Sequence, residues 1–272
     1  MQAPQLNQAD LDPQTRNFYC QTLGLLNKAR MPFLICGAYA LERYTGIARH
    51  TKDLDLFIRP HDCQRILDLL AQAGLETEMA VPHWLAKATY GENFIDLIFR
   101  SANGYCEVDD AWFENAVADE VLGIPVQVCA PEDMIWSKAF VMARDRFDGA
   151  DVAHLLLACG DCMNWARLLK NFGPHWRVLF SHLILFGFIY PEERSRIPDW
   201  VMNDLSQRLQ QELNSPPPVA NICRGPLLAP LQYLIDIEKW GYQDARLQPI
   251  GQLTPRNVEE WINHLHQEAN SH

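Results

Sequence analysis

Acidic residues alternate with branched apolar residues in one short segment, and this alternation constrains the fold of the chain most. Asp53 and Asp55 take alternate positions, and Leu54, Leu56 and Ile58 fill the positions between and after them. Successive side chains of a strand point to opposite faces, so the segment is predicted to be a strand with one apolar and one acidic face. The two carboxylates then lie on the same side, roughly 6.5–7 Å apart along the backbone.

A third acid, Asp96, lies in the middle of another apolar segment that runs from Phe94 to Phe99. Burying like charges close together is costly unless a cation lies between them. Oxygen ligands of this kind suit Mg²⁺, which keeps several waters and shares phosphate oxygens. If the two strands are neighbours, the three acids form one metal-binding cluster. The alternative is that Asp53 caps a turn, Asp55 faces solvent on an edge strand and Asp96 pairs with an arginine.

A predicted anion site precedes the acidic strand. The short apolar run over residues 33–36 ends at Gly37 and Ala38, after which a helix is predicted to begin. A tight turn that leads into a helix N-terminus presents backbone N–H groups and a positive dipole to an anion. With the basic residues Arg49 and Lys52 and the paired acids, this turn indicates a site for a metal-bound polyphosphate.

These residues together resemble the signature of the polymerase β-like nucleotidyltransferase superfamily. In that pattern a hydrophobic-Gly-Gly/Ser turn precedes an R-x-T-x-D-hydrophobic-D-hydrophobic strand, and a third acid follows on a later strand. The matching residues are Cys36-Gly37-Ala38-Tyr39-Ala40-Leu41, Gly46, Arg49, Thr51, Asp53-Leu54-Asp55-Leu56 and Phe94-Ile95-Asp96-Leu97-Ile98.

A later segment is similar to a helix of the small stand-alone members, which include antibiotic nucleotidyltransferases and toxin-type enzymes. Their helix has the pattern P-E-D/x…K…R-x-K-D-x-x-D, and the similar residues here are Pro131-Glu132-Asp133, Lys138 and Arg144-Asp145-Arg146-x-Asp148-x-x-Asp151. The resemblance covers about residues 33–158.

The resemblance implies transfer of a nucleoside monophosphate from an NTP to an acceptor hydroxyl or similar group, with loss of pyrophosphate. It implies that Asp53 and Asp55 hold two Mg²⁺ ions and that Asp96 holds the ion that activates the acceptor. Gly37 and the N–H of Ala38 would hold the β- and γ-phosphates.

Three basic residues complete the expected nucleotide site. Arg49 and Lys52 form its basic pair, although Arg49 is equally compatible with pairing to an acid of the cluster. Lys138 is expected to neutralise charge on the triphosphate, the alternative being a solvated lysine on a helix. The family usually has Gly or Ser where this chain has Ala38, so the backbone donor is kept and a hydroxyl that can reach a phosphate oxygen is lost.

Composition narrows the choice of acceptor and location. The net charge is −11, from 23 basic and 34 acidic residues, which excludes a globally basic nucleic-acid-binding surface. The basic residues after residue 131 are scattered, which favours a small molecule or a protein over long RNA as the acceptor, while a tRNA end stays open. The N-terminus shows no secretion signal, and no apolar stretch approaches the roughly 20 residues of a membrane span, so a cytoplasmic protein without membrane contact is expected.

The expected fold is α+β, with a small mixed sheet as the nucleotidyltransferase core and a helical C-terminal half. The predicted parts are a catalytic core over residues 1–130, a helical domain over 131–213 and a Pro-rich linker with a helical C-terminal segment over 214–272. Two other functions remain open: a catalytically silent nucleotide-binding module, suggested by Ala38, and a partner-binding module that uses the helical half.

Overall fold

The chain forms two compact units in the computed structural model, which describes residues 11–48 and 53–270. The first unit comprises Met1–Ala130 and Arg246–His272, and the second comprises Pro131–Ala245. The last part of the chain, from Arg246 on, therefore belongs to the same compact unit as the sheet. The two units are defined only by the compactness of each. The predicted division into parts at residues 130 and 213 therefore stays a prediction.

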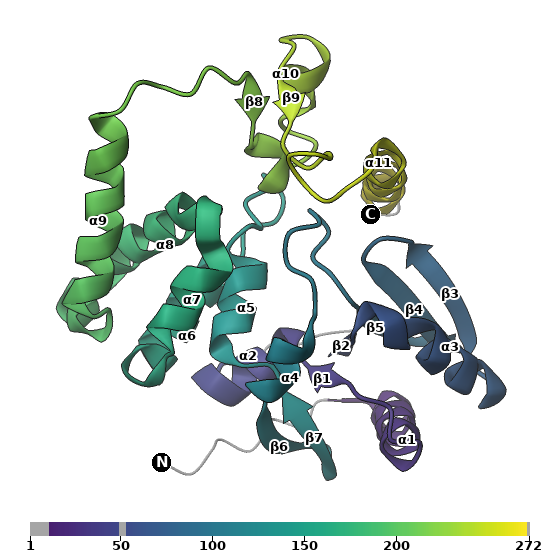
Figure 1. Cartoon of the computed structure of the whole chain (residues 1–272). Coiled ribbons are helices and arrows are strands. Elements are labelled where there is room, and N and C mark those ends of the chain that lie inside the picture. Colours follow the sequence, from purple (N-terminus) through teal and green to yellow (C-terminus); the bar gives the residue numbers. More distant parts are fainter. Residues whose placement is uncertain (1–10, 49–52, 271–272) are drawn as a thin grey trace. The chain divides into compact units, whose positions relative to one another are not determined.

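A mixed sheet forms the first unit, and among the described residues it has seven strands in the order β3-β4-β5-β2-β1-β7-β6 (Figure 1). β2 is parallel to β5 and antiparallel to β1, and β1 is parallel to β7. The strands are β1 (Leu34–Ile35), β2 (Asp55–Phe57), β3 (Glu76–Val81), β4 (Leu85–Tyr90), β5 (Asn93–Ile98), β6 (Val117–Val121) and β7 (Ile124–Val128). The expected mixed sheet is confirmed.

The helices of the first unit bury one apolar face each. In α1, Asp12 caps the N-terminus by accepting hydrogen bonds from the N–H groups of Gln14 and Thr15 at 2.9 and 3.1 Å. Phe18 and Leu23 are among the side chains that α1 buries. The helices of this unit are α1 (Pro13–Lys28), α2 (Gly37–Thr45), α3 (Cys63–Gln72), α4 (Asp110–Glu114) and α11 (Pro255–Asn270).

The C-terminal helix α11 packs beside β3, at one edge of the sheet (Figure 1). Trp261 of α11 is 6% exposed and forms a small apolar cluster with Val81 and Leu85. The guanidinium of Arg246 lies 5.3 Å from the centre of the Trp261 ring, and Arg246 is itself buried. These contacts explain why a segment so late in the chain joins the first unit.

The second unit is mainly helical, as expected from its sequence. A buried ion pair helps hold α5 to α7, because Arg167 Nη2 lies 2.5 and 2.6 Å from the two carboxylate oxygens of the fully buried Asp133. Its helices are α5 (Pro131–Lys138), α6 (Gly149–Cys159), α7 (Trp165–Phe172), α8 (Trp176–Ile189), α9 (Asp199–Leu213) and α10 (Leu234–Glu238), and β8 (Ile222–Cys223) pairs with β9 (Gln243–Asp244).

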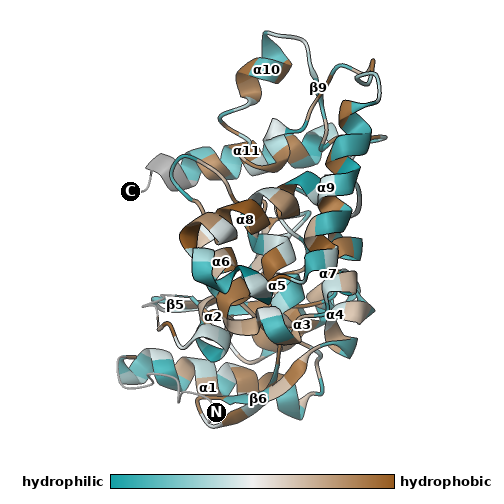
Figure 2. Cartoon of the chain, turned by 90° about the vertical axis from the view of Figure 1, so that its left-hand side faces the viewer, coloured by the Kyte–Doolittle hydropathy of each residue, from teal (hydrophilic) through white to brown (hydrophobic). Residues whose placement is uncertain are grey.

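The longest apolar stretch of the sequence forms α8, which is largely brown in the hydropathy colouring of Figure 2. The sequence predicts a buried helix over Val178 to Tyr190. The structure buries Leu183 and Phe186 but leaves Phe188 83% exposed, so only one face of α8 is covered. None of the described helices is both long and apolar enough to cross a membrane.

Two helical segments are shorter than the sequence predicts. A helix is expected over residues 132–145, but α5 ends at Lys138, and the chain then turns back through a bridge between Met142 and Phe147. A helix is also expected from Leu227 to Lys239, but only α10 forms, since Pro230 lacks the N–H that an interior helical residue donates.

Candidate active site

The pairing of β2 with β5 brings the three predicted acids together. Asp55 is the register partner of Asp96 on the neighbouring parallel strand. Asp53 precedes β2 by two residues and points to the same side. One carboxylate oxygen from each of the three residues lies within 4.8 Å of the others. The structure therefore confirms the proximity that the metal-cluster hypothesis requires.

Backbone hydrogen bonds fix the acids at this place in the sheet. The N–H of Asp96 donates to the carbonyl of Leu54 at 3.1 Å, and the N–H of Cys36 donates to the carbonyl of Asp55 at 3.1 Å. Leu54 and Leu56 are fully buried on the opposite face of the strand. Each aspartate keeps an intermediate exposure, so the carboxylates lie at the boundary between core and solvent.

Gly37, the first residue of α2, lies directly against the acidic cluster. A Cβ built on Gly37 would be 1.7 Å from Asp55 Oδ2, and the backbone φ of Gly37 is +56°. Both features require glycine here, because any side chain would overlap the carboxylate and strain the backbone. Cys36, the N-cap residue of α2, makes no capping hydrogen bond with its side chain, and Ala38 lies in the first turn of this helix.

Two buried tyrosines lie close to the same cluster. Tyr19 of α1 and Tyr39 of α2 pack edge to face, with ring centres 6.4 Å apart. Burial, then the charge of Glu42 and the charge of Asp53, raises the pKa of Tyr39 to about 12. Burial also raises the pKa of Tyr19, and the neighbouring tyrosine and Asp53 add to that shift. Both phenols therefore stay protonated near neutral pH and do not add to the negative charge of the cluster.

Lys87 is a neighbour of the cluster that the sequence analysis missed. It stands opposite Asp96 in the antiparallel pairing of β4 with β5, and its Nζ lies 3.4 Å from Asp96 Oδ1. The same ammonium is 4.9 Å from the centre of the Phe94 ring. The alternative from the sequence is that Asp96 pairs with an arginine. The structure pairs Asp96 with a basic residue, but that residue is Lys87.

Lys138 belongs to the second unit, where its ammonium lies between two acids. Its Nζ donates to Asp148 at 3.1 Å and to Asp151 at 2.8 Å. Burial alone would lower the pKa of Lys138, but the two carboxylates outweigh burial and raise it. The solvated-lysine alternative is therefore wrong, and the role of Lys138 in nucleotide binding stays a prediction. Arg49 and Lys52, the other basic candidates, lie outside the described residues.

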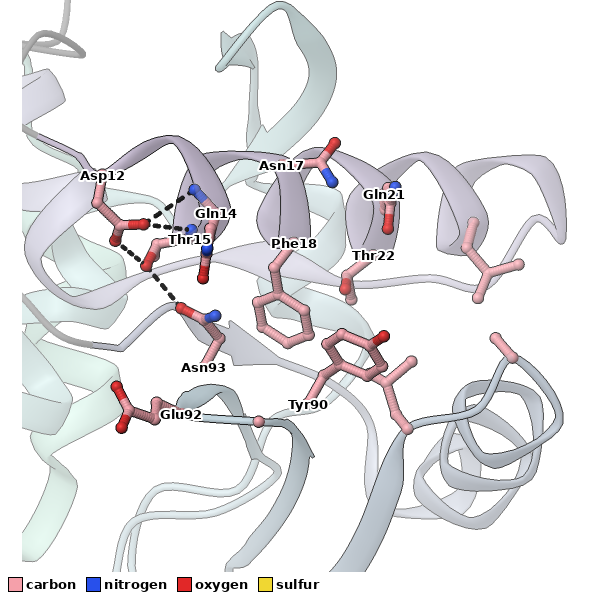
Figure 3. Close-up of a pocket in the computed structure, with 14 residues that line it drawn as sticks. Asp12, Gln14, Thr15, Asn17, Phe18, Gln21, Thr22, Tyr90, Glu92 and Asn93 are labelled. Atoms are coloured by element: carbon pink, nitrogen blue, oxygen red, sulfur yellow. Dashed lines mark hydrogen bonds between the residues drawn. The ribbon is translucent and has the colours of Figure 1, made fainter.

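A groove of about 910 Å³ lies elsewhere on the first unit, between α1 and the turn that joins β4 to β5 (Figure 3). Phe18 points into it from α1, and Tyr90, the last residue of β4, lies across from Phe18. Thr15 bonds to Asn93 at 2.6 Å at one end. None of the three clustered aspartates lines this groove, so it is separate from the candidate active site.

The donor set of the cluster fits Mg²⁺. All three ligands are carboxylates, and hard divalent cations prefer oxygen. Their spacing lets several oxygens approach one small region, and their partial exposure leaves room for waters and phosphate oxygens to complete the coordination.

A family model described as "Uncharacterised nucleotidyltransferase" matches residues 33–174, which is more than half of the chain and includes every residue of the acidic cluster. The chain belongs to this family. The match confirms the resemblance seen in the sequence and extends beyond residue 158, where the recognisable motifs end.

Several solved structures are similar to the chain at low identity. The antibiotic-resistance factor ANT(2'')-Ia is 16% identical, with 64% of this chain and 96% of that chain covered and a TM-score of 0.45. The lincosamide antibiotic adenylyltransferase LnuA is 13% identical, with coverage of 53% and 96% and a TM-score of 0.38. JHP933 from Helicobacter pylori is 14% identical, with coverage of 75% and 98% and a TM-score of 0.37. No curated protein sequence matches the chain.

Proposed function

We propose that this member of the nucleotidyltransferase family transfers a nucleoside monophosphate from an NTP to a hydroxyl of a small-molecule acceptor. In this reaction the acceptor oxygen bonds to the α-phosphorus, the bond from that phosphorus to the bridging oxygen breaks, and pyrophosphate leaves. The acceptor hydroxyl loses its proton. The observation that supports the proposal most is the meeting of three carboxylates within 4.8 Å beside the start of α2.

Asp53, Asp55 and Asp96 would hold two Mg²⁺ ions. When bound, such a pair of ions stabilises the attacking and the leaving oxygens of an in-line displacement. We assign Asp53 and Asp55 to both ions and Asp96 to the ion on the acceptor side. Asp96 comes from β5, the strand next to β2, and is the register partner of Asp55.

The first turn of α2 would bind the β- and γ-phosphates. Gly37 brings the backbone to the edge of the carboxylate cluster, and the N–H of Ala38 is a donor that needs no side chain. The lack of a hydroxyl at Ala38 leaves phosphate binding to backbone donors and to basic side chains. We assign this second contribution to Arg49, Lys52 and Lys138.

The charges of the second unit favour a small acceptor over a long nucleic acid. A groove for a phosphate backbone needs a row of available lysines and arginines. Here several arginines are instead paired with acids: Arg167 with Asp133, Arg177 with Glu212, Arg196 with Asp161 and Arg208 with Asp204. We further propose that the reaction takes place in the cytoplasm.

A labelling experiment tests the proposed reaction and the acceptor class together. The wild-type protein is incubated with Mg²⁺ and each of the four NTPs, labelled at the α-phosphate, together with a small-molecule extract, a protein extract or tRNA. We expect label in the small-molecule fraction and an equal amount of pyrophosphate. Asp55→Asn should abolish both, while Glu76→Gln, which changes an exposed acid of β3, should not.

Label in the protein or tRNA fraction would support the proposed reaction but show that the acceptor is a protein or a tRNA and not a small molecule. Binding of an NTP without transfer to any of the three fractions would contradict the proposal and favour the silent nucleotide-binding module.

A further inference from the structure

Lys87 places a positive charge next to the carboxylates to which the metal ions are assigned. Its Nζ lies 3.4 Å from Asp96 Oδ1, and the side chains of the pair are 24% and 14% exposed. Ion pairs that are shielded from water in this way are stronger than exposed ones, because solvent screens them less.

The register of the sheet fixes this contact. Lys87 and Asp96 are directly opposite in the antiparallel pairing of β4 with β5, so their side chains share one face. Ala86 and Ala88, on either side of Lys87, point to the other face and are fully buried. The ring of Phe94, on the same face as Asp96, lies beside the ammonium and limits its freedom.

Two physical effects follow from the contact. Three carboxylates within 4.8 Å repel one another, and the ammonium offsets part of this repulsion when no metal is bound. The ammonium also competes with a divalent cation for Asp96 and repels that cation directly. Both effects lower the affinity of the cluster for a free metal ion.

We propose that Lys87 is a positioning residue that holds Asp96 at the cluster and keeps its affinity for free divalent metal low, so that metal binds tightly only with the triphosphate. This inference rests on the metal-binding role proposed above for the three aspartates. In the nucleotide-free protein, the Lys87 ammonium offsets part of the attraction between the carboxylates and a metal ion. When an NTP binds, the negative charge of its triphosphate adds attraction for the metal ion.

The test measures Mn²⁺ binding to the full-length, nucleotide-free protein by the electron paramagnetic resonance signal of free Mn²⁺. We expect Lys87→Met to tighten Mn²⁺ binding at least about tenfold, since a neighbouring opposite charge shifts the proton equilibrium of a carboxylate by about one to three orders of magnitude and should act on a bound cation in the same direction. Lys87→Arg keeps the charge and should stay within about threefold of wild type. Lys28→Met, on the last turn of α1, makes the same change in net charge and should bind Mn²⁺ like wild type.

Two further readouts separate positioning from a general structural role. The double variant Lys87→Met/Asp96→Asn removes both charges and should not bind Mn²⁺ more tightly than wild type. This variant also tests the proposal if the single variant does not fold. In the transfer assay, Lys87→Met should lower kcat about tenfold or more at unchanged KM for the NTP, because Asp96 is no longer held in place.

Unchanged or weaker Mn²⁺ binding by Lys87→Met would overturn the inference. Transfer by the wild type together with unchanged Mn²⁺ binding by the variant would leave the proposed function intact. Tightened Mn²⁺ binding without transfer by the wild type would instead refute the proposed reaction and leave the role of Lys87 in place.

Discussion

The substitution Gly37→Ala should separate the chemistry of the site from its stability. A methyl group at Gly37 would lie 1.7 Å from Asp55 Oδ2, 2.7 Å from its Cγ and 3.0 Å from its Cβ. The first two distances are too short for non-bonded atoms, and the aspartate side chain is too short to bend away while its carboxylate stays in place. Asp55 must therefore rotate its carboxylate out of the cluster.

The expected magnitude has two parts. Alanine at a φ of +56° costs about 1–2 kcal/mol of folding free energy, because its Cβ approaches the carbonyl that follows. Displacing Asp55 adds a loss of activity, since a shift of about 1 Å in a catalytic group can cost about 100-fold in rate. We therefore expect a protein that still folds, with Mn²⁺ binding weakened and transfer reduced at least about 100-fold.

Gly91→Ala is the matched control. Its φ is +62°, close to that of Gly37, but a Cβ at Gly91 would meet nothing within 4 Å. Thermal unfolding followed by circular dichroism should give similar stability losses for the two variants, while only Gly37→Ala loses Mn²⁺ binding and transfer. Equal activity of the two variants would refute the argument that Gly37 is required by Asp55.

Three further predictions concern charged and titratable groups of the second unit. Arg167→Met should destabilise the protein by about 3–5 kcal/mol in urea unfolding, because Asp133 is left fully buried without its counter-charge. Lys138→Met should cost about 3 kcal/mol for the same reason, since Asp151 is 4% exposed, and a variant that lost only NTP affinity would show that Lys138 has no structural role. Burial, and then the charge of Arg224, lowers the pKa of His175 from 6.5 to about 4, so the unfolded chain binds this proton first. The free energy of unfolding should therefore fall as the pH falls from about 6.5 to 4, and His175→Gln should flatten that slope.

An exposed ion pair provides a control for the two variants that remove a buried positive charge. Arg177→Met breaks an ion pair whose partners are 57% and 49% exposed, and it should cost less than about 1 kcal/mol. If the buried and exposed variants behaved alike, burial would not be the cause of the expected losses.

The sequence predicts the acidic cluster well because strand geometry alone aligns its members. Alternation puts Asp53 and Asp55 on one face, and the structure adds only that β5 is the neighbour of β2, which brings in Asp96. The tight turn at Gly37 was also predictable, but its reason is tertiary: the residue must leave room for Asp55.

Lys87 could not be found in this way. Its strand, β4, has the sequence LAKATY, in which alanines occupy the buried positions and the usual branched strand formers are few. Without the strand, the register that pairs Lys87 with Asp96 could not be derived. The early end of α5 has a similar origin, because Lys138 pairs with Asp148 and Asp151 only if the chain turns back after Lys138.

Calorimetric titration of the four NTPs into the protein with Mg²⁺ tests the central claim most directly, because it needs no knowledge of the acceptor. We expect at least one NTP to bind the wild type and to lose most of that affinity in Asp53→Asn/Asp55→Asn. The control Glu76→Gln/Glu78→Gln removes two exposed acids with the same spacing on β3 and should bind like wild type. Wild-type binding that survives in Asp53→Asn/Asp55→Asn, or no binding of any NTP to the wild type, would contradict a metal–nucleotide site at the three aspartates.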